Sequence, residues 1–301
     1  MYIAPLSNVI RSFGINHHQY ADDTQLYITV LKDDVLSCVC RLESCINAVH
    51  KWLSQNWLSL NPKKSEAIQF TSGRGQGRVE DIASIAVSGV RIKPSTVVKS
   101  LGVTLDGGLT FDQHIANVCK ASYFHIRALR HVRKSLPDDV AKTVACSIVG
   151  SRIDYCNALL VGMSDSNFAK LQRVQNTLAR VVLGLRKFEH ITPALIELHW
   201  LPVKQRVTFK LATLTMKTIH SGQPTYLRDL VNAYEPVRTL RSSSQHLLCV
   251  GRTRTVTAAR SFRHSSATIW NSLPAEIRDC TAVDNFKRKL KTHLFKLAFA
   301  A

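Results

Sequence analysis

The hydrophobic pattern of this chain changes its period near Phe111, and the change limits the folds that the chain can adopt. Before Phe111, short runs in which apolar and polar side chains alternate, as at Leu26, Ile28 and Val30, lie on either side of one helical stretch at 34–56, and such alternation is the pattern of half-buried strands. After Phe111, apolar residues recur every three or four positions, which is the pattern of amphipathic helices. The sequence therefore predicts an α+β fold with a small strand-containing segment followed by a mainly α-helical region.

The expected elements divide the chain into three parts. Residues 11–31 are expected to form a β-hairpin whose turn falls on Asp22 and Asp23. Further short strands are expected at 85–87, 90–92 and 98–105, and helices at 34–56, 112–135, 137–150, 165–185, 202–220 and 282–297. The predicted domains are residues 1–111, a helical region at 112–235 and a basic C-terminal module at 236–301.

Two adjacent aspartates, Asp22 and Asp23, lie within the predicted hairpin. Paired carboxylates at a hairpin tip suit Mg²⁺, which prefers hard oxygen ligands and binds through one or two carboxylates together with substrate phosphates. The pairs Asp33-Asp34 and Asp138-Asp139 each precede a predicted helix, so helix capping is a sufficient explanation for them. The strand context of Asp22 and Asp23 favours a metal-binding role instead.

Positive charge is concentrated toward the C-terminus. The chain has 40 basic and 21 acidic residues, a net charge of +19, and residues 201–301 hold 17 of the basic and 5 of the acidic ones. Such an excess favours nucleic acid as a partner, because bound cations release counterions from the phosphate backbone. The candidate phosphate-binding residues are Lys170, Arg173, Arg180, Arg238, Arg241, Arg252, Arg254, Arg260 and Arg263. A basic surface that is merely solvated is the alternative.

Several classes of site and location are not favoured by the sequence. The eight cysteines form no Cys-x-x-Cys pair, so zinc spacing is absent. No apolar run reaches the roughly 18 residues that span a bilayer, and the first residues make a poor signal peptide. An intracellular protein, nuclear or cytoplasmic, not secreted and without a membrane partner, is expected. Four tryptophans are expected to pack in cores rather than to stack on bases: Trp52, Trp57, Trp200 and Trp270.

Four stretches together resemble one protein family. YADDTQLY (20–27) resembles the polymerase motif of reverse transcriptases from non-LTR, LINE-type retrotransposons. HKWLSQNWLSLNPKKSEAIQF (50–70) and VKSLGVTLDGGLTFDQHI (98–115) resemble the elements that follow in that family, and residues 252–295, with their WNSLP core, resemble the C-terminal tail of jockey-superfamily elements. The likeness covers most of the chain, with the four landmarks in the expected order.

The resemblance implies a role for particular residues. Asp22 and Asp23 match the catalytic metal ligands, which would hold Mg²⁺ or Mn²⁺, and Tyr20 and Ala21 match residues beside the primer terminus. Lys64 matches a lysine near the incoming nucleotide. Leu101 and Gly102 match the primer-grip strand. By resemblance, residues 1–111 would be part of a polymerase palm and the helices that follow a thumb, with an RNA template and a DNA primer as partners.

The resemblance also implies that this chain alone is inactive. In the family a further catalytic aspartate, the nucleotide pocket and the fingers lie upstream of the YADD motif, and MYIAPLSNVI resembles the segment directly before it. We therefore expect an RNA-directed DNA polymerase fragment that needs the missing upstream polymerase half as a partner. Two alternatives are a non-catalytic basic nucleic-acid-binding protein and a decayed retrotransposon relic.

Overall fold

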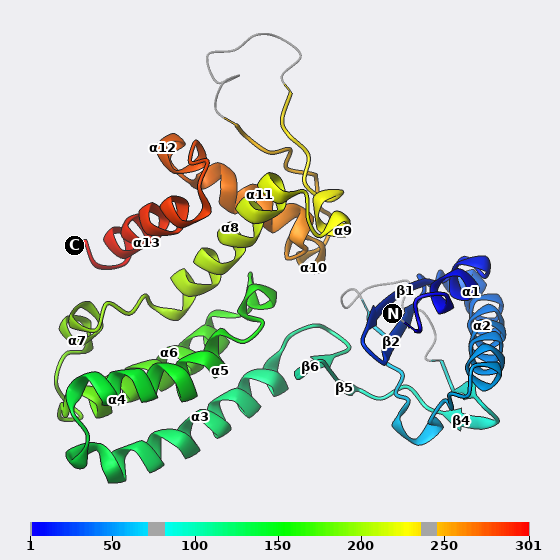
Figure 1. Ribbon diagram of the computed structural model, residues 1–301, viewed down its shortest axis with the longest axis horizontal. Helices are drawn as coiled ribbons and strands as arrows, with labels where there is room; N and C mark the ends of the chain where they lie inside the picture. The colour runs from blue at the N-terminus through cyan, green and yellow to red at the C-terminus, as the bar shows by residue number, and fades with distance from the viewer. Residues whose placement is uncertain (1, 72–81, 236–245, 301) are drawn as a thin grey trace. The chain divides into compact units, whose positions relative to one another are not determined.

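The computed structural model describes residues 2–71, 82–235 and 246–300, which form two compact units (Figure 1). Unit 1 is Met1–Leu109 and unit 2 is Thr110–Ala301. The predicted combination of helices with small antiparallel strand pairs is confirmed. No helix in the described ranges is both long and apolar enough to cross a membrane.

Unit 1 consists of hairpins and helices. Its helices are α1 (Leu6–Ser12) and α2 (Val35–Gln55), with short 3-10 turns η1 (Lys32–Asp34) and η2 (Pro62–Lys64). Its strands are β1 (Asn16–Tyr20), β2 (Asp23–Tyr27), β3 (Ile85–Val87), β4 (Val90–Ile92), β5 (Val97–Ser100) and β6 (Val103–Asp106). Within the described residues they pair as three two-stranded antiparallel hairpins, β1-β2, β3-β4 and β5-β6.

Helix α2 supplies the centre of unit 1. One side of it, at Cys45 and Val49, packs against Ile10 of α1, and the half-buried Leu26 of β2 covers the same cluster. On the neighbouring side, Ile46 packs against the β3-β4 hairpin. Because apolar residues recur every three or four positions along α2, two hairpins pack against this one helix.

Unit 2 is mainly helical in its described residues, with an isolated antiparallel bridge between Ala233 and Leu248. Its main helices are α3 (Asp112–Val132), α4 (Asp138–Ala145), α6 (Asp165–Leu183), α7 (Ile191–Glu197), α8 (Val203–Ser221), α11 (Phe262–Ser272) and α13 (Val283–Phe299). Shorter elements are η3 (Arg133–Ser135), the π-helical η4 (Cys146–Gly150), α5 (Ser151–Asp154), η5 (Asn157–Leu160), α9 (Thr225–Arg228), α10 (Val256–Ala259) and α12 (Ala275–Arg278).

The beginning of α3 is fastened to the beginning of α6. The side chain of Asn167, which is completely buried, donates to Asp112 Oδ1 over 2.7 Å. Ser164 caps α6 by accepting a hydrogen bond from the Asn167 backbone. The two long helices pack against each other from this point onward (Figure 1).

The C-terminal helices share a core with α8. Trp270 of α11 is buried and stacks on Phe286 of α13, with 5.7 Å between ring centroids. The Asn271 side chain donates to the carbonyl of Leu248 and accepts from the Leu248 N–H, each over 2.9 Å. The WNSLP stretch therefore holds the end of unit 2 together.

Three of the four tryptophan predictions are confirmed and one is wrong. Trp200 and Trp270 are buried, and Trp52 packs against the core of unit 1. Trp57 is instead 95% exposed, and it lies beyond the end of α2, directly after the cap residue Asn56.

Candidate active site and nucleic-acid interface

The acidic hairpin has a tighter turn than the sequence predicts. Tyr20 pairs with Asp23, so the two turn residues are Ala21 and Asp22, and Asp23 is the first residue of β2. The prediction of a turn on Asp22-Asp23 is wrong by one residue. A two-residue hairpin needs a positive φ in its turn, and here Ala21 provides it at 52°.

Both carboxylates of the pair are accessible. Asp22 is exposed in the turn, and Asp23 is on the exposed face of β2. Among the residues that the structure describes, neither carboxylate has a hydrogen-bond or ion-pair partner. Hard oxygen ligands with no competing cation are available to Mg²⁺.

The opposite face of the hairpin anchors it to the helices. Leu26 packs against the α1-α2 core, and the hydroxyl of Ser7 donates to Gln19 Oε1 over 2.7 Å. The acids are therefore carried on a fixed support, as a binding site requires.

A second hairpin is tied to the first. Strands β5 and β6 are joined by Leu101 and Gly102, whose φ angles of 44° and 81° match a type I′ turn. Directly before this turn, Ser100 accepts a hydrogen bond from Gln25 Nε2. The structure thus brings the predicted primer-grip residues to the hairpin that carries the acids.

Lys64 is not joined to the acids. It is exposed at the end of η2, and no ion pair between it and Asp22 or Asp23 is present in the described part of the chain. Its predicted role near the incoming nucleotide stays a prediction.

In the part of the chain that the structure describes, the two carboxylates are the candidate donors for a metal. Within residues 2–71, 82–235 and 246–300, no group of three or more histidine, cysteine, aspartate or glutamate side chains could hold a metal ion. Two carboxylates suit one Mg²⁺ that keeps waters and accepts substrate phosphates as its other ligands. A complete two-metal centre needs more carboxylate oxygen than the described residues bring to this hairpin.

The other two Asp-Asp pairs do not cap helices through their side chains, which corrects the capping explanation. Asp34 makes no capping bond, and its Oδ2 is 3.4 Å from Cys38 Sγ. Burial first, and then Asp34, raise the pKa of the Cys38 thiol. Asp138 forms an ion pair with Arg133 instead. Asp34 and Asp138 therefore have local side-chain contacts that Asp22 and Asp23 do not share.

Sequence reasoning missed a basic face on α3. Four cations lie on its exposed side and just beyond its end, with the 61% exposed ring of Phe124 between them: Lys120, Arg127, Arg130 and Lys134. None of the four has an ion-pair or hydrogen-bond partner among the described residues. The buried side of the helix, at Ile115, Ser122, Ile126 and Leu129, faces the opposite way. The signal that could have found this face is the spacing of Lys120, Phe124 and Arg127 together with the absence of acids between Asp112 and Asp138.

The predicted basic residues have varied environments. Arg252, Arg254 and Arg263 are exposed, whereas Arg238 and Arg241 lie outside the described residues. Arg260 is half-buried, donates to the Val161 carbonyl over 3.1 Å and covers the Phe111 ring.

The basic side chains of α6 already form local hydrogen bonds. Lys170 donates to Asn167 Oδ1, and Arg173 and Arg180 donate to the carbonyls of Ala169 and Glu189. These local bonds leave less of each cation for phosphate than the unpaired cations of α3 offer.

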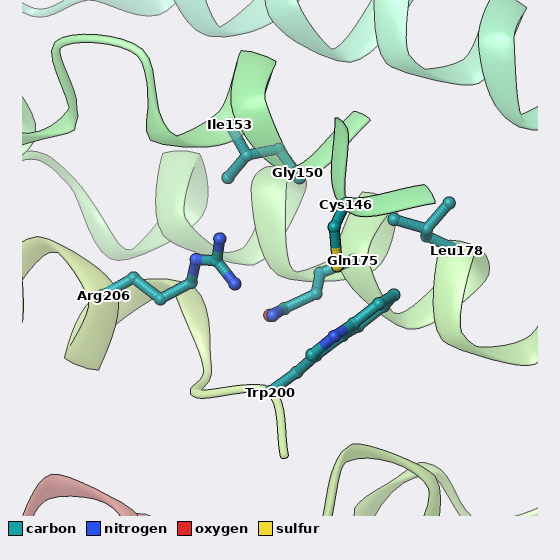
Figure 2. A pocket seen from close by; sticks show the side chains of 7 residues that line it. All are labelled: Cys146, Gly150, Ile153, Gln175, Leu178, Trp200 and Arg206. Carbon is teal, nitrogen blue, oxygen red and sulfur yellow. The ribbon is translucent and has the colours of Figure 1, made fainter. Parts of the chain in front are cut away.

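A cavity between the helices of unit 2 is too small to bind a nucleotide. It is lined by Cys146, Gly150, Ile153, Gln175, Leu178, Trp200 and Arg206, and its volume of about 20 Å³ suits a single water molecule. Figure 2 shows the Trp200 indole beside the side chains of Gln175 and Cys146. Gln175 is already bonded to the Leu201 carbonyl, and Arg206 to Asp154. The cavity is part of the packing between helices.

Comparisons with known proteins find similarity to reverse transcriptases. Residues 1–105 match the family described as reverse transcriptase (RNA-dependent DNA polymerase). The chain is also 29% identical over 103 residues to the RNA-directed DNA polymerase from mobile element jockey of Drosophila melanogaster. That match covers 34% of this chain and 10% of the relative, and no solved structure matches. Residues 1–105 are therefore similar to reverse transcriptases, and the chain is similar to one encoded by a mobile element.

Proposed function

We propose that unit 1 contributes the metal-binding and primer-gripping part of an RNA-directed DNA polymerase, and that unit 2 holds the template and primer. The observation that carries the proposal is the pair of exposed, unpartnered carboxylates on a hairpin whose other face is anchored to helices. In this reading unit 1 belongs to the palm, and the helices from Asp112 onward form the thumb.

The residues of unit 1 have different roles in this proposal. Asp22 and Asp23 would hold Mg²⁺, which when bound neutralises phosphate charge during nucleotidyl transfer. Tyr20 and Ala21 border the primer end, and the turn at Leu101-Gly102 contacts it. The hydrogen bond between Gln25 and Ser100 holds this turn beside the acidic hairpin. Lys64 supplies a cation for the phosphates of the incoming nucleotide.

The same geometry supports inactivity of the isolated chain. In-line phosphoryl transfer with two metal ions needs carboxylates that clamp both ions about 3.5–4 Å apart. Asp22 and Asp23 are neighbours on one hairpin, and no third carboxylate joins them in the described part of the chain. We propose that a separate polymerase segment completes the centre by supplying that carboxylate.

A second candidate function is nucleic-acid binding without chemistry. The basic face of α3 favours it, since free cations around an exposed ring suit a phosphate backbone and do not depend on a metal. The two functions share the binding surface and differ only in whether the acids bind metal.

Metal binding separates the two candidates. Mn²⁺ titration followed by water-proton relaxation should detect a weak site in the full chain that Asp22→Asn and Asp23→Asn each weaken. The matched control is Asp33→Asn with Asp34→Asn, an adjacent pair in the same unit that should leave Mn²⁺ binding unchanged. Loss of binding in the control and not in the hairpin variants would overturn the metal assignment.

Primer extension tests the predicted inactivity. On a poly(rA)–oligo(dT) substrate with Mg²⁺ or Mn²⁺, the chain alone should incorporate no nucleotide above background. Incorporation that disappears in Asp22→Ala would show that the chain is a complete polymerase.

A further inference from the structure

Helix α2 ends in a turn that normally favours glycine, and this chain places a tryptophan there. The Leu58 N–H donates to the Leu53 carbonyl over 2.9 Å, and the Trp57 N–H donates to the Ser54 carbonyl over 3.3 Å. These are the two bonds of a Schellman motif, in which the residue after the helix cap adopts a left-handed conformation. Trp57 does so, with φ of 59°.

The strain at Trp57 is not offset by burial. A left-handed backbone disfavours every residue with a β-carbon relative to glycine. A large aromatic ring could compensate by packing, but the Trp57 side chain is 95% exposed. Glycine would form the same turn without the strain and without an apolar surface in water, so folding of unit 1 gives no reason for the indole.

The surroundings of Trp57 are cationic and aromatic. The stretch from residue 44 to residue 65 contains no acidic residue, and it carries the exposed Lys51, Lys63 and Lys64. The hydroxyl of Tyr2 donates to the carbonyl of Asn56 over 2.9 Å, and 65% of Tyr2 is exposed. A second exposed ring is thus anchored beside the turn.

We propose that Trp57 stacks on a base of single-stranded nucleic acid, a role that rests on the proposed function because it assumes a nucleic-acid partner. Exposed aromatic rings among unpaired cations bind single strands by stacking on bases while the cations contact the backbone. Bases within a duplex already stack on one another, so the strand at Trp57 is unpaired.

The test compares strands that differ only in their bases. The full chain is titrated, by fluorescence anisotropy at one salt concentration, with a labelled single strand of about 12 nucleotides, a matched abasic strand and a matched duplex. RNA and DNA versions of each identify the preferred sugar. Wild type should bind the base-containing strand about 5- to 150-fold more tightly than the abasic strand, since stacking of one base contributes about 1–3 kcal/mol.

Substitutions at position 57 separate stacking from folding. Trp57→Gly should raise the thermal unfolding midpoint, because the strain is removed, and should remove the preference for the base-containing strand. Trp57→Phe should retain most of that preference. Phe188→Ala, which removes another exposed ring (92%) from unit 2, is the control and should change neither.

Three results would overturn the proposal. One is an unchanged preference for bases in Trp57→Gly. Another is a lowered unfolding midpoint in that variant, which would give the indole a packing role. The third is an equal loss of affinity for all strands, which indicates a general electrostatic or protein-docking role. If wild type binds no strand at all, the proposed function itself fails, and this outcome is distinct from the other three.

Discussion

Gln25 donates a hydrogen bond from its side-chain amide to the hydroxyl of Ser100, across 75 residues of sequence. Gln25 is on the same face of β2 as Asp23, because side chains two positions apart on a strand point the same way. Ser100 immediately precedes the turn at Leu101-Gly102. This hydrogen bond joins the hairpin that carries the acids to the hairpin whose turn we assign to the primer.

Gln25→Ala should loosen the second hairpin without unfolding unit 1. An ordinary hydrogen bond contributes about 0.5–1.5 kcal/mol, so amide exchange in Val97–Asp106 should become roughly two- to tenfold faster. Hydrogen exchange with mass spectrometry measures this directly. Gln113→Ala, which removes a surface bond to Asn117 in unit 2, serves as the control. Unchanged exchange in β5 and β6 would show that the bond does not hold the hairpins together.

Neutralising the α3 face should weaken nucleic-acid binding and its dependence on salt. Removing one cation that neutralises a phosphate should lower the slope of log affinity against log salt by about 0.7–0.9. The triple change Lys120→Gln, Arg127→Gln and Arg130→Gln should therefore reduce the slope by roughly 2–3. The control is Lys204→Gln, because this ammonium is 3.7 Å from the carboxylate of Asp165. Equal slopes for the triple variant and wild type would exclude α3 from the interface.

Unit 2 should lose stability as the pH falls below neutrality because of His114. This side chain is buried, and burial lowers its pKa from the ordinary 6.5. Below pH 6.5 the unfolded chain binds more protons than the folded one, so stability present above 6.5 is lost as pH falls toward the lower folded pKa. Urea unfolding at a series of pH values should show a smaller loss in His114→Gln.

His17 in unit 1 adds a loss of the same sign. Its pKa is lowered by burial and by the nearby positive charges of Arg11 and His18. If the free energy of unfolding depends on pH in His114→Gln as it does in wild type, groups other than His114 cause the loss of stability.

Truncating Trp270 should destabilise the C-terminal core severely. The indole is 2% exposed, stacks on Phe286 and donates to the His246 carbonyl over 2.8 Å. Trp270→Ala should cost about 3–5 kcal/mol in the free energy of unfolding, and Trp270→Phe clearly less. Denaturant titration of both variants, with Phe188→Ala as an exposed aromatic control, measures the difference. A loss below about 1 kcal/mol in Trp270→Ala would mean that the core closes around the gap.

The helices were predictable because their apolar spacing is local information. The expected ranges 165–185, 202–220 and 282–297 differ from α6, α8 and α13 by at most two residues at either end. Each of these helices buries one regular stripe, so periodicity alone locates it. The acidic hairpin was predictable for the same reason.

The details of the site depend on information that the pattern does not carry. The turn lies at Ala21-Asp22 because the register of a hairpin depends on which residue accepts a positive φ, and alanine gives no sign of doing so. The exposure of Trp57 depends on where α2 stops. The pairing of Gln25 with Ser100 depends on how two distant hairpins meet. Residue type and spacing identified the candidate acids but not the side chains that hold them in place.

The bonds between Asn271 and Leu248 have a consequence for how the tail can change over time. The side-chain amide of Asn271 donates and accepts hydrogen bonds as the backbone of a paired strand would. Its two bonds go only to main-chain atoms of residue 248. Any residue except proline, which lacks the N–H, can offer those atoms. The residue bonded to Asn271 can therefore vary among apolar residue types that fit the core in which Leu248 is buried, while the asparagine itself cannot vary. Related copies of this tail should differ more at position 248 than at position 271.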